Sequence, residues 1–188
     1  MHAVLTIIGV GWAIFWIAWL VAAFTAKASR ARGGRLTFVR IALLVVALSL
    51  IRANWGSGGS GGGGLRAGSD PVLAGIGLAL WAAGLAVAVW ARLYIGRNWG
   101  MPMTRRKEPE LVTTGPYRLI RHPIYAGILL AMAGTALATT LFGLIAVAVI
   151  AGFFTFSATR EERFLAGEFP ETFPPYKAKT KMLIPFVL

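Results

Sequence analysis

One short stretch, residues 115–127, concentrates the residue types that could do chemistry. It contains one of the two histidines of the chain, with two arginines, two tyrosines and two prolines. Pro123 favours a helix start and pushes the residue before it toward extended backbone, so His122 should lie just outside a helix. The free N–H groups of a first helical turn favour an anionic ligand, and Arg118 and Arg121 add positive charge there. We therefore predict an anion-binding site, although arginines that only follow membrane topology and contact lipid phosphates would give the same pattern.

A pair of acidic residues, Glu161 and Glu162, directly follows the last long apolar stretch. Ionisable groups near hydrocarbon are costly and need a partner. One interpretation is an ion pair with Arg118 or Arg121, and the other is a carboxylate that contacts a cationic or hydroxyl-rich ligand. Both can hold, with one glutamate serving each purpose.

Several other chemistries find little support. The chain has no cysteine, which excludes a disulfide, a thiolate nucleophile and a cysteine metal site. A single histidine beside glutamates lacks the ligand count of a metal site, so we predict none. A G-x-G-x-x-G pattern, Gly56 to Gly61, lies inside the Gly/Ser run 56–64, and we interpret it as a flexible linker, natural or engineered. An enzyme with so few bases would depend on positioning and electrostatics.

The elements that must position these residues are membrane helices. Of the 188 residues 57% are hydrophobic, the mean hydropathy is +0.69, and the apolar residues gather in blocks. A membrane span needs about 20 such residues. We predict one all-α, polytopic membrane domain over residues 1–188, with a helix start at Ser69 or Asp70 followed by Pro71. Five spans are expected, the last two forming a helical hairpin: 4–25, 36–51, 72–95, 124–139 and 141–159.

The basic residues give an orientation. A net charge of +12 first suggests nucleic acid, but the charges lie between the apolar stretches. In the five-span layout, every Lys and Arg except Arg52 and Arg66 falls on one side, which is the cytoplasmic side by the positive-inside rule. We therefore expect an outside N-terminus, a cytoplasmic C-terminus and a cytoplasmic cofactor site within residues 96–188. The expected partner is the lipid bilayer and not nucleic acid, and the oligomeric state is left open.

From residue 96 onward the chain resembles a known family. The residues that carry the resemblance are Leu111-Val112-Thr113-Thr114-Gly115-Pro116-Tyr117, Arg121-His122-Pro123-Ile124-Tyr125-Ala126-Gly127, Glu161-Glu162, Tyr176 and Ile184-Pro185. The pattern is similar to that of the isoprenylcysteine carboxyl methyltransferases and related membrane methyltransferases of phospholipids and small thiols. The resemblance implies an S-adenosylmethionine-dependent integral membrane methyltransferase, with a lipophilic or prenylated small-molecule substrate.

The resemblance also implies roles for particular residues. Arg160 and Glu162 are predicted as catalytic residues. The predicted cofactor-binding residues are Leu111, Val112, Tyr117, Arg121, His122, Pro123, Ile124, Tyr125 and Glu161. In one respect the chain departs from the family, which often has an arginine about one turn before the acidic pair, where this chain reads Phe154 to Thr159. Either Arg160 takes over that role, or the acceptor is not a prenylcysteine.

The scarcity of bases bears on the methyl acceptor. A carboxylate is already ionised at neutral pH and needs no base, whereas an amine must lose a proton, for which only His122 or Glu162 is evident. This favours a carboxylate or thiol acceptor, and an O-methyltransferase most of all. Two alternatives stay open at this point: a membrane sterol-type reductase that uses NADPH, and a non-enzymatic accessory membrane protein.

Overall fold

The computed structural model describes residues 2–25, 70–96, 110–141 and 143–185, and the elements in these ranges are helical. The helices are α1 (His2–Thr25), α3 (Pro71–Ile95), η3 (a 3-10 turn, Gly115–Arg118), α4 (Pro123–Thr139), α5 (Gly143–Glu168) and α6 (Phe173–Lys179). The prediction of an all-α fold is confirmed for them. The predicted span 36–51 and the linker 56–64 lie outside the described residues.

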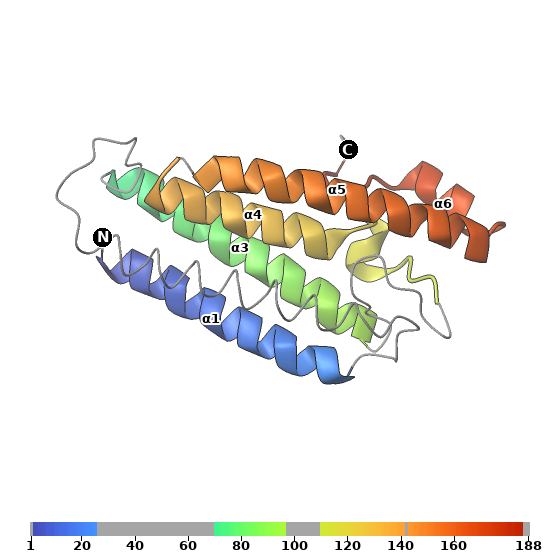
Figure 1. Ribbon diagram of the computed structural model, residues 1–188, viewed down its shortest axis with the longest axis horizontal. Coiled ribbons are helices and arrows are strands. Elements are labelled where there is room, and N and C mark those ends of the chain that lie inside the picture. Colours follow the sequence, from blue (N-terminus) through green and yellow to red (C-terminus); the bar gives the residue numbers. More distant parts are fainter. Residues whose placement is uncertain (1, 26–69, 97–109, 142, 186–188) are drawn as a thin grey trace.

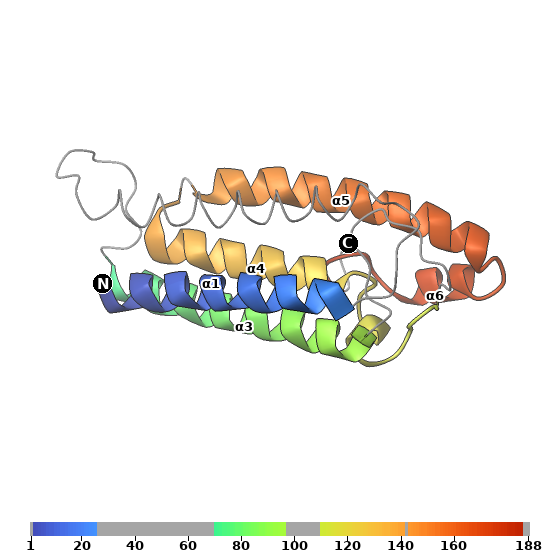
Figure 2. The same cartoon turned by 60° about the horizontal axis from the view of Figure 1, so that its bottom comes forward.

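The four longest helices lie side by side along the long axis of the molecule, and the short α6 sits at one end (Figures 1 and 2). Three of them, α1, α3 and α5, are long and apolar enough to cross a membrane. The apolar α4 has 17 residues, at the short end of what a span requires. Large apolar side chains such as Ile14, Leu93 and Val149 are exposed on the outer faces, as suits helices in lipid.

Local signals explain where these helices begin and end. Asp70 caps α3 by accepting a hydrogen bond from the Val72 N–H (2.8 Å), and Pro71 follows it as predicted. At the other end of α3, Arg92 donates to the carbonyls of Gly96 (2.8 Å) and Ala22 (3.0 Å). One side chain thus bonds a carbonyl at the end of α3 and a carbonyl near the end of α1.

The last long helix, α5, continues to Glu168, beyond the predicted end of its apolar stretch at residue 159. The extra residues are mostly Arg, Glu, Leu and Ala, which favour helix, and no proline interrupts them. The charged extension matters because it carries the two predicted acidic site residues out of the apolar segment.

A seam of glycines joins α3 and α4. Gly77 and Gly84 of α3 lie against Gly134 and Gly127 of α4, and we call these four residues the glycine seam. A Cβ at Gly84 would lie 2.4 Å from the backbone nitrogen of Ala131, and one at Gly134 would lie 2.4 Å from the backbone nitrogen of Trp81. Only glycine allows two membrane helices to approach so closely.

Charge is concentrated at one end of the bundle, where α1, α3 and α5 end, α4 begins and α6 packs (Figure 1). We call it the polar end. Every Lys and Arg of the described residues belongs to the segments at this end: Arg92, Arg118, Arg121, Arg160, Arg163, Lys177, Lys179 and Lys181. The predicted separation of charge is thus present in the described part of the chain, while the assignment of this end to the cytoplasm stays a prediction.

Candidate functional site

The loop before α4 is fixed to α3 by a glycine and a tyrosine. Gly115 has a φ of +59°, a backbone conformation that favours glycine, and a Cβ there would lie 2.5 Å from the exposed Tyr94 ring. The Tyr117 side chain is buried, donates to the Ala91 carbonyl of α3 (3.3 Å) and packs in one apolar cluster with Val112. The loop is therefore held in place before the chain reaches its charged residues.

The start of α4 confirms the boundary predicted from Pro123, which is the first residue of this helix. His122 precedes it as the N-cap, and its side chain is buried. The backbone of this segment pairs with the tail of the chain: the Arg121 N–H donates to the Lys181 carbonyl (2.8 Å), and the His122 N–H donates to the Met182 carbonyl (3.0 Å). The tail thus completes the loop that carries the motif.

A buried carboxylate organises the charges around this loop. Glu162 is only 3% exposed, and its two oxygens lie 2.6 Å from Arg121 Nε and 2.8 Å from Lys177 Nζ. His122 Nε2 lies 3.5 Å from the same carboxylate, and Arg121 also donates to the Thr180 carbonyl. The ion-pair interpretation is therefore confirmed for Glu162, with Arg121 as its partner.

The neighbouring carboxylate has a different environment. Glu161 is 30% exposed, and its Oε2 lies 3.5 Å from the Tyr125 hydroxyl and 4.0 Å from His122 Nδ1. Its contacts are longer than those of Glu162, and a larger part of it faces outward. Of the two acidic residues, Glu161 is the more accessible.

Three rings form a column between α4 and α5. The rings of His122 and Tyr125 stack with centroids 5.4 Å apart and planes 4° apart, and Tyr125 stacks on Phe154 at 4.5 Å and 12°. The sequence-based prediction missed Phe154, although it lies two turns before Glu161 and so shares its helix face. The aromatic column links the charged residues to the apolar part of α5.

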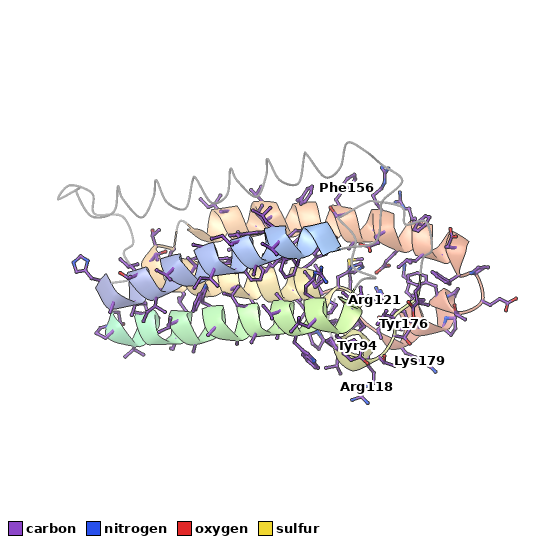
Figure 3. All side chains as sticks on the ribbon, turned by 90° about the horizontal axis from the view of Figure 1, so that it is seen from below. Tyr94, Arg118, Arg121, Phe156, Tyr176 and Lys179 are labelled. Carbon is purple, nitrogen blue, oxygen red and sulfur yellow. The ribbon has the colours of Figure 1, made fainter. Side chains whose placement is uncertain are left out.

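The α6 helix closes the other side of the site. Tyr176 donates to the Tyr117 carbonyl (2.7 Å), and burial raises the pKa of this phenol to about 12. Lys177 and Thr180 also belong to this segment, and the prediction did not include them. Figure 3 shows Arg121 and Tyr176 near each other at this end, whereas Arg118 projects away from the bundle.

The predicted site residues divide into three groups. Arg121, His122, Tyr125, Glu161 and Glu162 come together. A second group is buried or partly buried: Leu111, Val112, Tyr117, Pro123 and Ile124. Arg160 stands apart, exposed, with its guanidinium carbon 5.9 Å from the ring centroid of Phe156. Phe156 itself projects from the side of α5 opposite Arg121 (Figure 3). The binding and catalytic roles of all these residues stay predictions.

The chain matches the model of a known protein family. The family model described as phospholipid methyltransferase matches residues 73–172, which include all but the first two residues of α3 and the whole of η3, α4 and α5. Part of the chain is also similar to the protein-S-isoprenylcysteine O-methyltransferase of Schizosaccharomyces pombe, with 34% identity over 89 residues, 44% of this chain and 36% of the relative.

Two further relatives are named as metal-resistance proteins. The chain is 38% identical over 94 residues to the cobalt-zinc-cadmium resistance protein CzcN of Cupriavidus metallidurans, covering 48% of this chain and 43% of that protein. It is 34% identical over 94 residues to the nickel-cobalt-cadmium resistance protein NccN of Alcaligenes xylosoxydans xylosoxydans, covering 48% and 44%. The chain spans less than half the length of each of these three relatives. The matches favour neither the reductase nor the accessory-protein alternative.

Proposed function

The chain belongs to the phospholipid methyltransferase family, and on that basis we propose that it is an S-adenosylmethionine-dependent methyltransferase of the membrane. The observation that carries the proposal is the meeting of Glu161, Tyr125 and His122 at the start of α4. A cofactor that carries a carboxylate, an amino group, ribose hydroxyls and a sulfonium needs partners of just these kinds.

The donor set fits such a cofactor. The partly exposed Glu161 carboxylate can accept hydrogen bonds from amino or hydroxyl groups. The first turn of α4 and the nearby Arg121 favour a carboxylate, and the rings of Tyr125 and His122 offer aromatic surface to a cation. When bound, such a cofactor would supply an electrophilic methyl group for a lone pair of the acceptor, with the electron pair of the carbon–sulfur bond left on sulfur.

The two residues predicted as catalytic would then act in different ways. Glu162 is enclosed by Arg121, Lys177 and His122, so we assign it the role of a positioning residue that holds the loop before α4 against α6. Arg160 is exposed on another side of α5, where it would attract an anionic acceptor from the membrane surface. Neither role requires a proton to move, which suits a carboxylate acceptor.

The acceptor and the arrangement in the membrane complete the proposal. We assign O-methylation of a lipophilic carboxylate, supported by the name of the S. pombe relative and by the surplus of basic residues at the polar end. The chain would cross the bilayer five times, with α4 and α5 as the final hairpin and the polar end in the cytoplasm. The cofactor would arrive from the cytosol and the acceptor laterally, from the lipid.

Isothermal titration calorimetry of S-adenosylmethionine into the purified protein in lipid nanodiscs tests the cofactor assignment. Glu161→Gln should weaken binding about ten- to hundredfold, the range expected for hydrogen bonds to a charged group. His122→Ala should weaken it as well, through loss of the ring that stacks on Tyr125. Glu168→Gln is the matched control, because Glu168 is exposed at the end of the same helix.

Two results would contradict the proposal. One is unchanged affinity for S-adenosylmethionine in both Glu161→Gln and His122→Ala. The other is selective binding of NADPH by the wild type, which would restore the reductase. Transfer of a labelled methyl group from the cofactor into a lipid extract, followed by mass spectrometry, would then identify the acceptor.

A further inference from the structure

A buried hydroxyl on α5 has no hydrogen-bond partner among the described residues. Ser157 has no exposed surface, and its Oγ makes no hydrogen bond to any described residue. The threonines two positions away on either side behave differently: Thr155 donates to the Ala151 carbonyl and Thr159 to the Thr155 carbonyl, each at 2.8 Å. Leaving a buried hydroxyl unpaired costs about 1–3 kcal/mol. A serine hydroxyl can donate to a carbonyl of its own helix, as these two threonines do, so the unpaired Ser157 calls for an explanation.

The position of Ser157 on the helix provides one. It lies three residues after Phe154 and four before Glu161, so the three side chains share one face of α5. On that face Phe154 stacks on the Tyr125 ring, and Glu161 lies 3.5 Å from the Tyr125 hydroxyl. Ser157 therefore lies on the face that meets the aromatic column, between its apolar and its charged parts.

The surroundings define the chemistry that this hydroxyl can recognise. From Phe154 to Thr159 the helix carries no charge, and the guanidinium of the exposed Arg160 lies over the Phe156 ring. A group bound at Ser157 is thus met by one neutral hydroxyl, about one helical turn closer to the apolar segment than Glu161. A lipophilic molecule with an oxygen at its head fits this position, with its chain along the apolar part of α5.

We propose that the Ser157 hydroxyl donates a hydrogen bond to a head-group oxygen of the lipophilic methyl acceptor and so orients it beside the aromatic column. This assignment rests on the proposed function and deepens it, because it names the residue that selects the acceptor. It separates two subsites along one helix face: the Glu161 end contacts the cofactor, and the Ser157 turn contacts the acceptor.

The test uses the full-length protein in nanodiscs, S-adenosylmethionine, and three probe acceptors that carry a free carboxylate: an S-farnesylated cysteine, an S-geranylgeranylated cysteine and a long-chain fatty acid. Ser157→Ala should lower kcat/KM for the methylated probe about three- to tenfold, the effect of one hydrogen bond. The dissociation constant of S-adenosylmethionine should stay within about twofold. Thr155→Val is the matched control, because its hydroxyl is already bonded within the helix.

A stability measurement excludes a merely structural role. Without ligands, Ser157→Ala should unfold at the same temperature as the wild type or a higher one, since the substitution removes an unpaired buried group. A lower unfolding temperature would mean that the hydroxyl serves the fold, and this would overturn the inference.

Other results would overturn it as well. Unchanged acceptor kinetics in Ser157→Ala is one, and an equal loss of cofactor affinity is another, because the hydroxyl would then belong to the cofactor subsite. A wild type that binds S-adenosylmethionine but methylates none of the three probes would also contradict it. A wild type that does not bind the cofactor would instead overturn the proposed function itself, and the inference with it.

Discussion

The glycine seam brings two backbones together, whereas the polar end holds its helices together through long side chains. At the seam, Gly84 leaves no room for even one added carbon. At the polar end, α4 and α5 meet through the rings of Tyr125 and Phe154, and through Arg121 and Glu162. A backbone contact has one geometry, but side chains can change rotamer. The seam is therefore suited to act as a fixed platform, and the polar end to adjust around a ligand.

The glycine seam and the polar end are also stabilised in different ways. The seam is apolar, and its contribution comes from dispersion contacts between closely packed small residues. The polar end depends on a buried ion pair, which is weak evidence for stability as a whole but becomes costly when one partner is removed. Substitutions in the two regions should consequently differ in how strongly they lower the recovery and the stability of the folded protein.

The largest effect is expected at the seam. Gly84→Ile places a branched side chain where a Cβ would already lie 2.4 Å from the backbone nitrogen of Ala131. Since backbone cannot move aside cheaply, α3 and α4 should separate, and little folded protein should be recovered. Fluorescence-detected size-exclusion chromatography in detergent measures this recovery.

A glycine on the same helix provides the control. Gly75 has no atom within 4 Å of the position where a Cβ would lie, so Gly75→Ile should give normal recovery. If both substitutions behaved alike, the close approach of α3 and α4 would not be the feature that fixes this part of the fold.

An intermediate effect is expected at the buried carboxylate. Glu162→Gln leaves Arg121 and Lys177 without their negative partner and should cost about 3–5 kcal/mol of unfolding free energy. Glu161→Gln should cost less than about 1 kcal/mol, because this side chain is partly exposed and its contacts are long. Unfolding in detergent, followed by circular dichroism, compares the two. Equal losses would show that the adjacent glutamates do not have separate roles.

The smallest effect concerns the hydrogen bond between α6 and the loop before α4. Tyr176→Phe removes the bond to the Tyr117 carbonyl and should cost about 1 kcal/mol at neutral pH. Burial raises the pKa of Tyr176 from 10.0 to about 12, so the folded protein favours the neutral phenol. The contribution of the neutral phenol to the free energy of unfolding is complete below about pH 10 and is lost as the pH rises through about 12.

The measurement is a pair of unfolding curves for wild type and Tyr176→Phe, recorded at several pH values from 7 upward. The stability difference between them should narrow as the pH passes 10 and approaches 12. A difference that is constant over this range would mean that the phenol is not buried in the way the structure indicates.

Most of the fold could be predicted because its signals are local. The Asp70-Pro71 and His122-Pro123 pairs fix helix starts through backbone geometry. Long apolar stretches indicate membrane helices. The extension of α5 to Glu168 was missed, since hydropathy marks where an apolar segment ends and not where a helix ends.

The candidate site was predictable in its residues but not in their arrangement. Glu161 and Glu162 are identical in type and adjacent in sequence, and about 100° around the helix decides which one is buried. The pairing of Arg121 and His122 with the tail is made by backbone groups, which leave no mark on residue type. Phe154 and Ser157 lie in an apolar stretch where composition gives no reason to single them out.

The contact between the loop and the tail has a consequence for the order of events during synthesis. Arg121 leaves the ribosome 59 positions ahead of Thr180, whose carbonyl it will contact, and all of α5 is made in the interval. Chains fold progressively from the N-terminal side as they emerge. The glycine seam can therefore close while translation continues, but the charged loop must wait, with its arginine still solvated, until α6 arrives.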